Sequence, residues 1–507
     1  MTEAHSQRYD VIVVGKGNAA LCAALAAHEK GARVVMLEAA SQDDSGGNSR
    51  FAGGVMRFAF SGVDELQKVI ELTPAEIADS DFGTNTTEEF FDDLFRLTHY
   101  KTDPQLSEVL VTRSLDVMVW LRSKGVKLVP NYGRQSAVVN GRRRFFGRMP
   151  VEVSGGGSGL VQFLDRAVEK AGITVHYKTR VKSLLMDGER VAGVIANQNG
   201  KTVSFEAGAV VLACGGFEAN TEMRTRYLGT GWDLAKVRGS RFNQGDGLNM
   251  ALDIGASSHG NWSGAHATGW DMNAPPYGDL NVGDQFQKHS YIFGLLVNSR
   301  GERFVDEGAD FHSFTYAKYG GEVLKQPGQM AWQVFDSKVS KLLRSEYRIK
   351  MMTKVSANTL EELATKMEGV DPQGFLKTVR AYNAAAQSDV PFDHTIKDGK
   401  GTVGIDPPKT NWAQALDTPP FDAYGTTCGI TFTFGGLRIN PDNGQVLDVM
   451  HEPIPGLFCA GEMVGGIFYF NYPSGTGLVS GAVFGRLAGH GAAQHVQHVQ
   501  HVQEQIA

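Results

Sequence analysis

The corner GKGNAA at residues 15–20 is the first stretch whose residue types and spacing could do chemistry. Gly15 would let the chain turn sharply, Gly17 would let a pyrophosphate approach the backbone, and small Ala20 would let the following helix pack close to the preceding strand. The N-terminus of that helix would offer N–H groups and the positive end of its dipole to phosphates. Glu38 ends a second apolar run, where an acid can accept hydrogen bonds from a ribose diol. The pattern predicts a dinucleotide-binding site rather than an ordinary glycine-rich turn.

Further turns of small residues recur along the chain, and each would bring backbone donors close to a flat ring beside the pyrophosphate. They lie in the stretches SGGNSR, AGGVM, ACGGF, GDG, GLFCAGE and YPSGTGL. Besides the first corner and Glu38, the predicted cofactor contacts are Asn18, Ala19, Gly46, Gly47, Asn48, Ser49, Gly53, Gly54, Val181, Cys214, Gly215, Gly216, Asp246, Gly461, Glu462, Gly477 and Leu478.

Two other stretches could bind anions, but their residues favour structural roles. GGGSG at 155–159 precedes helix-like and strand-like segments. Its spacing differs from GxGxxG and no acid ends the strand, so we do not expect a separate NAD(P) site there. Arg142, Arg143, Arg144 and Arg148 form a basic cluster, which is more typical of a solvated surface than of an anion site.

The elements that would position these turns alternate between strands and helices. An apolar run at 11–14, a helical pattern at 21–26 and the second apolar run indicate strand, turn, helix and strand, and residues 181–213 indicate a strand meander. From about 266 to 428 aromatic residues and prolines become frequent and the βα rhythm is lost, which indicates an inserted domain. We expect domain parts at residues 1–265, 266–428 and 429–493, followed by a tail at 494–507.

The tail contains the repeat HVQHVQHVQ. Metal binding by His495, His498 and His501 is one interpretation of this repeat. A disordered, solvated extension is the expectation, and no metal site is predicted.

The chain has 507 residues, a formal net charge of −6 and four cysteines without a CxxC pair. This charge gives no general attraction to nucleic acid. Scattered cysteines fit a reducing compartment and supply no iron–sulfur ligand set. No apolar run approaches the roughly 20 residues of a membrane helix, and the N-terminal MTEAHSQRYD has no signal-peptide core. We expect a soluble, cytoplasmic protein that does not bind nucleic acid.

The motifs, in this order, resemble the FAD-binding family of succinate dehydrogenase and fumarate reductase flavoprotein subunits, which also contains 3-ketosteroid and tricarballylate dehydrogenases. The stretches RFAGGVMR, RFVDEGADF, FTFGG and FNYPSGTGL look most like the tricarballylate dehydrogenase branch. The resemblance implies FAD and an α/β fold: a Rossmann-like FAD-binding domain, with a parallel sheet, helices and a β-meander, interrupted by an α+β capping domain. Asn48 stands where relatives with covalent flavin have a histidine, which implies noncovalent FAD.

The resemblance also places candidate substrate residues. His266 falls in the slot of a substrate-binding histidine of fumarate reductases. Their proton-carrying arginine matches Phe311, and the arginine that closer tricarballylate dehydrogenase relatives have one place later matches His312. A further histidine and arginine of the fumarate reductase site fall on Phe432 and Tyr472. These differences disfavour fumarate reduction through the usual arginine.

Dehydrogenation beside a carbonyl or carboxylate needs a hydride acceptor, a base and donors for the charge that develops on oxygen. FAD would accept the hydride. His312 is the expected base, because imidazole titrates near neutral pH, and Tyr316 and Tyr319 are its rivals. The expected donors and substrate contacts are His266, Tyr472, Arg303, Phe432 and Gly475.

Two of these residues have open alternatives. Arg303 could bind a carboxylate through its planar fork, or it could pair with Asp306 or Glu307. Tyr472 lies in a Tyr-Pro-x-Gly arrangement that is similar to 3-ketosteroid dehydrogenases, where a tyrosine hydroxyl and a backbone N–H hold the substrate ketone. The other interpretation is a tyrosine that packs on the flavin.

The favoured function is an FAD-dependent dehydrogenase that desaturates a tricarballylate-type polycarboxylate by hydride transfer to flavin N5. The alternatives are a desaturase of a cyclic ketone or keto acid, of the 3-ketosteroid or 4-oxocyclohexane carboxylate type, and a fumarate reductase-like flavoprotein subunit. The aromatic residues near the predicted site favour a cyclic ketone, whereas the basic cluster at 142–148 favours a polycarboxylate. The expected partners are a small-molecule substrate and a membrane-bound or soluble electron acceptor.

Overall fold

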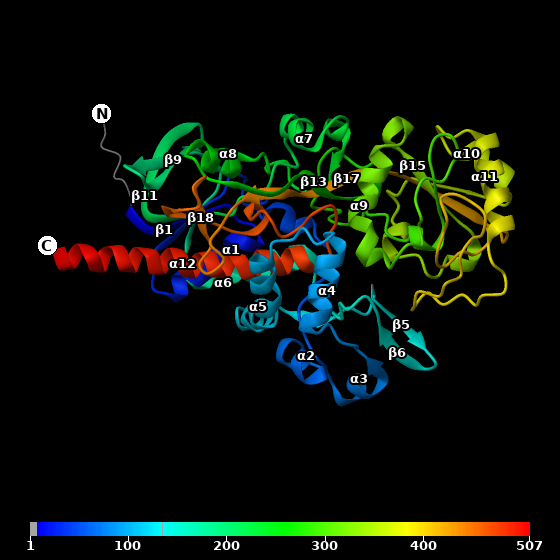
Figure 1. Ribbon diagram of the computed structural model, residues 1–507, viewed down its shortest axis with the longest axis horizontal. Helices are drawn as coiled ribbons and strands as arrows, with labels where there is room; N and C mark the ends of the chain where they lie inside the picture. The colour runs from blue at the N-terminus through cyan, green and yellow to red at the C-terminus, as the bar shows by residue number, and fades with distance from the viewer. Residues whose placement is uncertain (1–7, 134, 507) are drawn as a thin grey trace.

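The computed structural model describes residues 8–133 and 135–506. Residues 1–7 lie outside the described residues, and they make up most of the N-terminal stretch in which no signal-peptide core is expected. Ala507, the last residue of the expected tail, also lies outside them. Two connected bodies are visible in Figure 1, one on the left around β1 and β11, and one on the right around β15 and α11. Within the described ranges, no helix combines the length and the apolar character needed to cross a membrane.

The left-hand body is built on a sheet with the strand order β18-β19-β11-β1-β2-β8. Strands β1, β2, β8, β11 and β19 run parallel, and β9 and β10 extend the sheet from β11 as an antiparallel meander, as expected for residues 181–213. The core of β1 is buried on both faces, which explains its continuous apolar run. The strands are β1 (Arg8–Val14), β2 (Val34–Leu37), β8 (Thr174–His176), β9 (Thr179–Asp187), β10 (Arg190–Gln198), β11 (Lys201–Leu212), β18 (Gln445–Leu447) and β19 (Pro453–Cys459).

Two helices pack closely beside this sheet, α1 (Asn18–Glu29) and α12 (Thr476–Ile506). A Cβ at Gly485 would lie 2.5 Å from the carbonyl oxygen of Ala19, and one at Gly489 would lie 2.2 Å from that of Ala23. These glycines therefore allow the two backbones to approach. The remaining helices of this body and its neighbouring lobe are α2 (Val63–Val69), α3 (Pro74–Asp79), α4 (Thr87–Leu97), α5 (Pro104–Ser123), α6 (Gly156–Lys170), α7 (Thr221–Leu228) and α8 (Asp246–Asp253).

The C-terminal residues 494–506 form the end of α12, which corrects the expected disordered tail. Figure 1 shows this helix running along the body to the C-terminus. Val496 is buried, and a Cβ on Gly208 of β11 would lie 2.8 Å from it. Gln497 Nε2 donates to the Lys30 carbonyl oxygen (2.7 Å). Extending a formed helix costs little compared with nucleating one, so these contacts suffice to continue it into the repeat.

The right-hand body is a sheet in which β17 pairs with four other strands. The expected boundaries at 266 and 428 fall inside β13 and β17, so these two paired strands run continuously across both boundaries. Its strands are β12 (Lys236–Val237), β13 (Ser258–Asp271), β14 (Leu295–Val297), β15 (Ala331–Phe335), β16 (Lys354–Ala357) and β17 (Phe421–Leu437), and its helices are α9 (His312–Leu324), α10 (Leu360–Lys366) and α11 (Pro372–Ala385).

Short strands complete the lobe below the two bodies in Figure 1. They are β3 (Ser80–Asp81), β4 (Leu128–Pro130), β5 (Ser136–Val139), β6 (Arg142–Phe145) and β7 (Val151–Val153). Arg57 connects this lobe to the last glycine-rich turn, because its buried guanidinium donates to Asp93 Oδ2 (3.1 Å) and to the carbonyl oxygens of Gly147 (2.9 Å) and Ser474 (3.0 Å). The lobe therefore supports the turn that carries Tyr472 and Gly475.

Candidate active site

A cavity lies between the first body and the inserted segment. Most of the predicted cofactor contacts line it, although they come from distant parts of the chain. The predicted residues in its wall are Gly15, Gly17, Asn18, Ala19, Glu38, Gly47, Asn48, Ser49, Gly53, Gly54, Val181, Cys214, Gly215, Asp246, Gly461, Glu462, Gly477 and Leu478.

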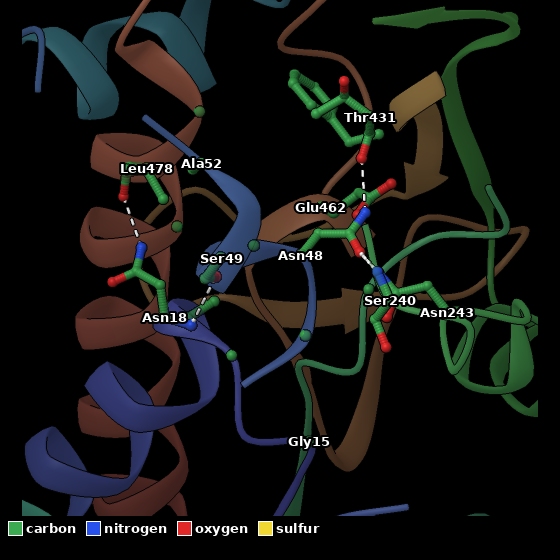
Figure 2. A pocket seen from close by; sticks show the side chains of 18 of the residues that line it. Gly15, Asn18, Asn48, Ser49, Ala52, Ser240, Asn243, Thr431, Glu462 and Leu478 are labelled. Atoms are coloured by element: carbon green, nitrogen blue, oxygen red, sulfur yellow. Dashed lines mark hydrogen bonds between the residues drawn. The ribbon is translucent and has the colours of Figure 1, made fainter. Parts of the chain in front are cut away.

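The first corner has the geometry expected of a pyrophosphate cradle. Gly15 has a φ of +107°, and a Cβ there would lie 2.5 Å from the Ala213 carbonyl oxygen, so only glycine fits. The N–H of Asn18, at the start of α1, donates to Ser49 Oγ (3.0 Å), and Asn18 Nδ2 donates to the Leu478 carbonyl oxygen (2.7 Å), as Figure 2 shows. Three separate turns are thereby joined around one helix N-terminus.

Glu38 lies at the end of β2, where its side chain is almost completely buried in the cavity wall. Its Oε1 accepts a hydrogen bond from the Ala40 N–H (2.8 Å). Burial raises the pKa of Glu38, whereas this hydrogen bond and the charge of Lys16 lower it. A carboxylate in this place can accept hydrogen bonds from a ribose diol.

Three predicted cofactor residues shape the cavity from behind rather than lining it. Ala20 is buried within α1. A Cβ on Gly46 would lie 2.6 Å from the Arg50 side chain, and one on Gly216 would lie 2.2 Å from Glu462 Oε1. The glycines of the GGGSG stretch likewise serve packing, because a Cβ on Gly157 would lie 2.0 Å from the Ser49 carbonyl oxygen.

Asn48 is fully engaged by neighbouring groups. Its Nδ2 donates to the Thr431 carbonyl oxygen (2.6 Å) and to Glu218 Oε1, and its Oδ1 accepts from the Ser240 N–H (2.7 Å). Figure 2 shows this amide between Thr431 and Ser240, with Glu462 nearby. Burial raises the pKa of Glu218 well above its ordinary value, with Glu462 adding to the effect. The Asn48 side chain is thus part of a buried network of hydrogen bonds.

Two tyrosine hydroxyls meet at the end of the cavity nearest the inserted segment. Tyr316 of α9 and Tyr472 of the last turn are hydrogen-bonded through their hydroxyls, and Ser474 Oγ donates to the Tyr316 hydroxyl (3.4 Å). Burial raises the pKa of Tyr316, while Arg238 and the two hydrogen bonds lower it. Burial also raises the pKa of Tyr472, and the charge of Tyr316 and the hydrogen bond to it raise it further. Either hydroxyl can donate in this pair, and both are harder to ionise than a free tyrosine.

His266 lies one layer behind this pair and does not line the cavity. Its ring stacks on Phe432 (centroids 5.2 Å apart) and meets Tyr316 and Tyr472 edge-on (4.9 Å each). Burial and the charge of Arg238 hold its pKa well below the usual range. His266 is therefore neutral near pH 7, and it supports the aromatic wall instead of facing the substrate space.

His312 reaches the cavity from the first residue of α9 and is held by two donors. Arg344 Nη1 lies 3.2 Å and Gln135 Nε2 lies 3.4 Å from its Nε2. Arg344 Nη1 also lies 3.3 Å from Nδ1 of His289, whose Nε2 lies 2.6 Å from Thr268 Oγ1. The expected base is thus one member of a cluster of two histidines and an arginine.

The structure corrects the expected roles of Arg303 and Tyr319, neither of which lines the cavity. Arg303 Nε donates to Glu307 Oε1 (3.1 Å) and its Nη1 donates to the Pro407 carbonyl oxygen (2.7 Å). The ion pair with Glu307, one of the two open alternatives, is the one that forms. The Tyr319 hydroxyl donates to the Asp306 carbonyl oxygen. Both side chains stabilise the inserted segment.

Phe432 and Gly475 do line the cavity, as expected of substrate contacts. The basic cluster does not: Arg148 pairs with Asp93 (3.1 Å), and Arg142, Arg143 and Arg144 lie on β6.

Several lining residues had no motif that would have revealed them: Gln135, Arg238, Asp284, Gln287, His289 and Arg344. They come from loops of irregular sequence, and only the folded chain brings them together.

Comparison with known proteins decides what this cavity holds. A family model described as FAD binding domain matches residues 10–478. The chain belongs to this family. It is 31% identical to Probable fumarate reductase Ifc3 of Shewanella frigidimarina, over 97% of this chain and 76% of that protein. It is 28% identical to 3-oxosteroid 1-dehydrogenase of Mycobacterium tuberculosis, over 73% of this chain and 68% of that protein.

A solved structure of the open conformation of a flavocytochrome c3 fumarate reductase has a TM-score of 0.73 and 28% identity, covering 97% of this chain and 79% of that one. The family is of the succinate dehydrogenase/fumarate reductase flavoprotein type. The protein is accordingly an FAD-dependent oxidoreductase acting on CH–CH groups. The names of these relatives give no support to tricarballylate as the substrate.

The residues present fit FAD. A glycine-only corner at a helix N-terminus, a buried acid at the end of β2 and glycine turns on the opposite wall match the pyrophosphate, ribose and ring of the cofactor. The last turn opens α12 beside the cavity, and its N-terminus favours negative charge on the adjacent ring. FAD therefore leaves the tyrosine pair and the histidine and arginine cluster for the substrate.

Proposed function

We propose that this flavoenzyme desaturates a carbon pair next to a ketone, with Tyr472 and Gly475 holding the carbonyl and Tyr316 removing the proton from the adjacent carbon. The pair of hydroxyls from Tyr316 and Tyr472 in the cavity is the observation that carries the proposal. The aromatic wall beside it, including Phe432 and Phe468, suits a ring better than a tricarboxylate. We therefore favour the cyclic ketone over the polycarboxylate.

The two tyrosines have different tasks in this proposal. Tyr472 keeps its proton because burial raises its pKa, so its hydroxyl serves as a donor to the carbonyl oxygen. Gly475 lies beside it with a φ of +80°, and its N–H is the second donor. Tyr316 is the better base, because the charge of Arg238 and the hydrogen bond from Ser474 favour its phenolate.

His312 is a poorer base than expected. A guanidinium only donates hydrogen bonds, so His312 Nε2 must accept from Arg344 and its lone pair is already used. We assign it instead to holding Arg344. FAD, when bound, supplies the acceptor for the hydride that leaves the neighbouring carbon.

The test is anaerobic flavin bleaching by a panel of candidate substrates. We expect cyclohexanone-type ketones to bleach the flavin and tricarballylate and succinate to leave it oxidised. Tyr472→Phe should slow bleaching by roughly 10²-fold, because one donor to the developing oxyanion is lost. Tyr319→Phe, on α9 one turn after Tyr316 and outside the cavity, is the control and should bleach at the parent rate. Bleaching by tricarballylate but by no ketone would overturn the proposal.

Reduction of a carbon–carbon double bond is a second candidate, favoured by the 31% identity to a probable fumarate reductase along nearly the whole chain. It uses the same site in the opposite direction. Flavin reduced beforehand with dithionite would be reoxidised anaerobically by fumarate if this function holds. Reoxidation of the flavin by an enone but not by fumarate would instead indicate the reverse of the ketone desaturation. A soluble or membrane-bound electron acceptor would reoxidise the flavin after desaturation, whereas reduction of a double bond would need an electron donor.

FAD is noncovalent in this proposal. All hydrogen-bonding atoms of the Asn48 amide are used by Thr431, Glu218 and Ser240, and an amide offers no nucleophile to the flavin. The test is given below with the other predictions.

A further inference from the structure

Two acids meet at the cofactor side of the cavity, and the proposed reaction uses neither of them. Glu218 directly follows the ACGGF stretch and is completely buried, whereas Glu462 ends the GLFCAGE stretch and lines the cavity. We propose that Glu218 is a neutral carboxylic acid whose proton is shared with the Glu462 carboxylate, and that it positions the side chains that face FAD. This role concerns the cofactor, so it does not depend on which substrate the enzyme takes.

Glu218 reaches the cofactor site only through its neighbours. Its side chain does not line the cavity, but its Oε1 accepts hydrogen bonds from Asn48 Nδ2 and Asn243 Nδ2, and both of these amides do line it. Figure 2 shows Asn48, Asn243 and Glu462 in this part of the cavity wall. Glu218 is therefore a positioning residue rather than a direct contact of the cofactor.

The hydrogen bonds of the two acids require a proton between them. Glu218 Oε2 is buried and accepts no hydrogen bond from any N–H or O–H donor within residues 8–133 and 135–506. The two carboxyl groups are hydrogen-bonded to each other, and two carboxylates cannot form this bond because both only accept. Glu462 Oε1 already accepts from the Thr433 N–H (2.6 Å) and from Thr433 Oγ1 (3.1 Å). Glu462 is therefore the acceptor of the pair, and Glu218 is the donor.

No lysine or arginine of the described chain forms an ion pair with either acid. The charge of Arg224 acts on Glu218, but its guanidinium donates to the carbonyl oxygens of Ala235 (2.8 Å) and Asp233 (3.1 Å). Burial raises the pKa of both acids, and the charge of Glu462 raises that of Glu218 further, whereas the hydrogen bond from Glu218 lowers that of Glu462. Two buried carboxylates at this distance cannot both ionise at low cost, so one proton stays on Glu218.

Glycines leave exactly the space that this network fills. A Cβ on Gly216 would lie 2.2 Å from Glu462 Oε1, and one on Gly239 would lie 2.2 Å from Asn48 Oδ1. A larger residue at either position would displace a member of the network. The arrangement is thus built into the backbone of the cofactor-binding body.

The shared proton has a consequence for the bound cofactor. A flavin gains negative charge on reduction, and a second buried carboxylate in the cavity wall would oppose that charge. With Glu218 neutral, the wall has one negative charge where two acids stand. Glu218 also accepts from the Asn48 and Asn243 amides and thereby fixes their orientation at the cofactor.

Glu218→Gln tests the charge state in the holoenzyme, because glutamine keeps an acceptor for the two amides and an N–H donor for Glu462. We expect the midpoint potential of the bound flavin at pH 8 to equal that of the parent. We also expect the parent to show the infrared carbonyl band of a protonated carboxylic acid, and the variant to lose it. A raised potential in the variant, or a parent without this band, would show that Glu218 is ionised and would overturn the proposal.

Glu218→Met tests the positioning role, because it keeps the length of the side chain and removes its hydrogen bonds. The dissociation constant of FAD, measured from the fluorescence released on dilution of the holoenzyme, should rise on the order of 10-fold or more, and Glu218→Gln should keep the parent value. The control is Glu222→Gln, which neutralises an exposed acid on α7 that pairs with Arg226 and should change neither the band nor the affinity. A Glu218→Met enzyme that retains FAD like the parent, or a Glu218→Gln enzyme that loses it, would overturn the proposal.

Discussion

Replacing Tyr316 by phenylalanine removes the proposed base while keeping its ring against His266 and His289. General base catalysis contributes typically 10²–10⁴-fold, so flavin reduction by a cyclic ketone should slow by about that factor. This corresponds to roughly 3–5 kcal/mol of transition-state stabilisation. Tyr472, which remains, keeps its role as a donor to the carbonyl.

The pH dependence gives the sharper expectation. Burial raises the pKa of Tyr316 above the ordinary value of 10, so less than about 1% of its hydroxyl is ionised at pH 8. Reaction through the phenolate should therefore accelerate about tenfold for each pH unit between 7 and 9. Tyr316→Phe should lose this slope altogether, since no group in its place titrates.

The assay is stopped-flow anaerobic flavin reduction at saturating ketone from pH 6 to 9, with Tyr319→Phe as the control for removing a buried hydroxyl from the same helix. The control should keep both the rate and the slope. A Tyr316→Phe enzyme that reduces its flavin at the parent rate, or that retains the parent pH slope, would refute the assignment of the base. In the second case another group carries the proton.

Three further outcomes follow from residues around the cofactor site and from the buried arginine that supports it. Because the Asn48 amide is fully hydrogen-bonded, acid-precipitated protein should be colourless and the yellow flavin should stay in the supernatant; a yellow pellet would contradict noncovalent binding. Gly15→Val should abolish FAD binding, measured as the flavin-to-protein absorbance ratio, because its Cβ would lie 2.5 Å from the Ala213 carbonyl oxygen; a parent-like ratio would argue against the cradle. Arg57→Met should lower the free energy of unfolding by about 1–3 kcal/mol, because the buried carbonyl oxygens of Gly147 and Ser474 lose their donor and Asp93 loses one of its cationic partners; denaturant unfolding measures this, and an unchanged midpoint would show that these contacts add nothing.

The cofactor half of the site could be predicted from sequence because its signals are local. A glycine at a φ of +107° and an acid at the end of a buried strand are constraints that neighbouring residues express directly. The strand meander before ACGGF was predicted for the same reason. Once the strands pair in register, the small-residue turns at their ends reach the same edge of the sheet. The turns found in the sequence therefore include most residues on the cofactor side of the cavity wall.

The substrate half could not be predicted in this way, because its residues share no motif. Arg344 lies in an irregular stretch far along the chain from His312, yet the two side chains are 3.2 Å apart. Arg303 illustrates the converse: its local pattern left a substrate carboxylate or Asp306 or Glu307 as possible partners, and in the folded chain the partner is Glu307. The tail was misjudged because packing of Val496 beside Gly208 continues the helix, a contact between distant residues.

The division between the two halves has a mechanistic consequence. Tyr472 and Gly475 belong to the last turn of the cofactor-binding body, whereas Tyr316, His312 and Arg344 belong to the inserted segment. The hydroxyl pair exists only while the two bodies are together, since each contributes one member. In the proposed reaction, proton removal and carbonyl polarisation are therefore contributed by different parts of the chain. A ketone held between Tyr316 and Tyr472 would contact both bodies at once.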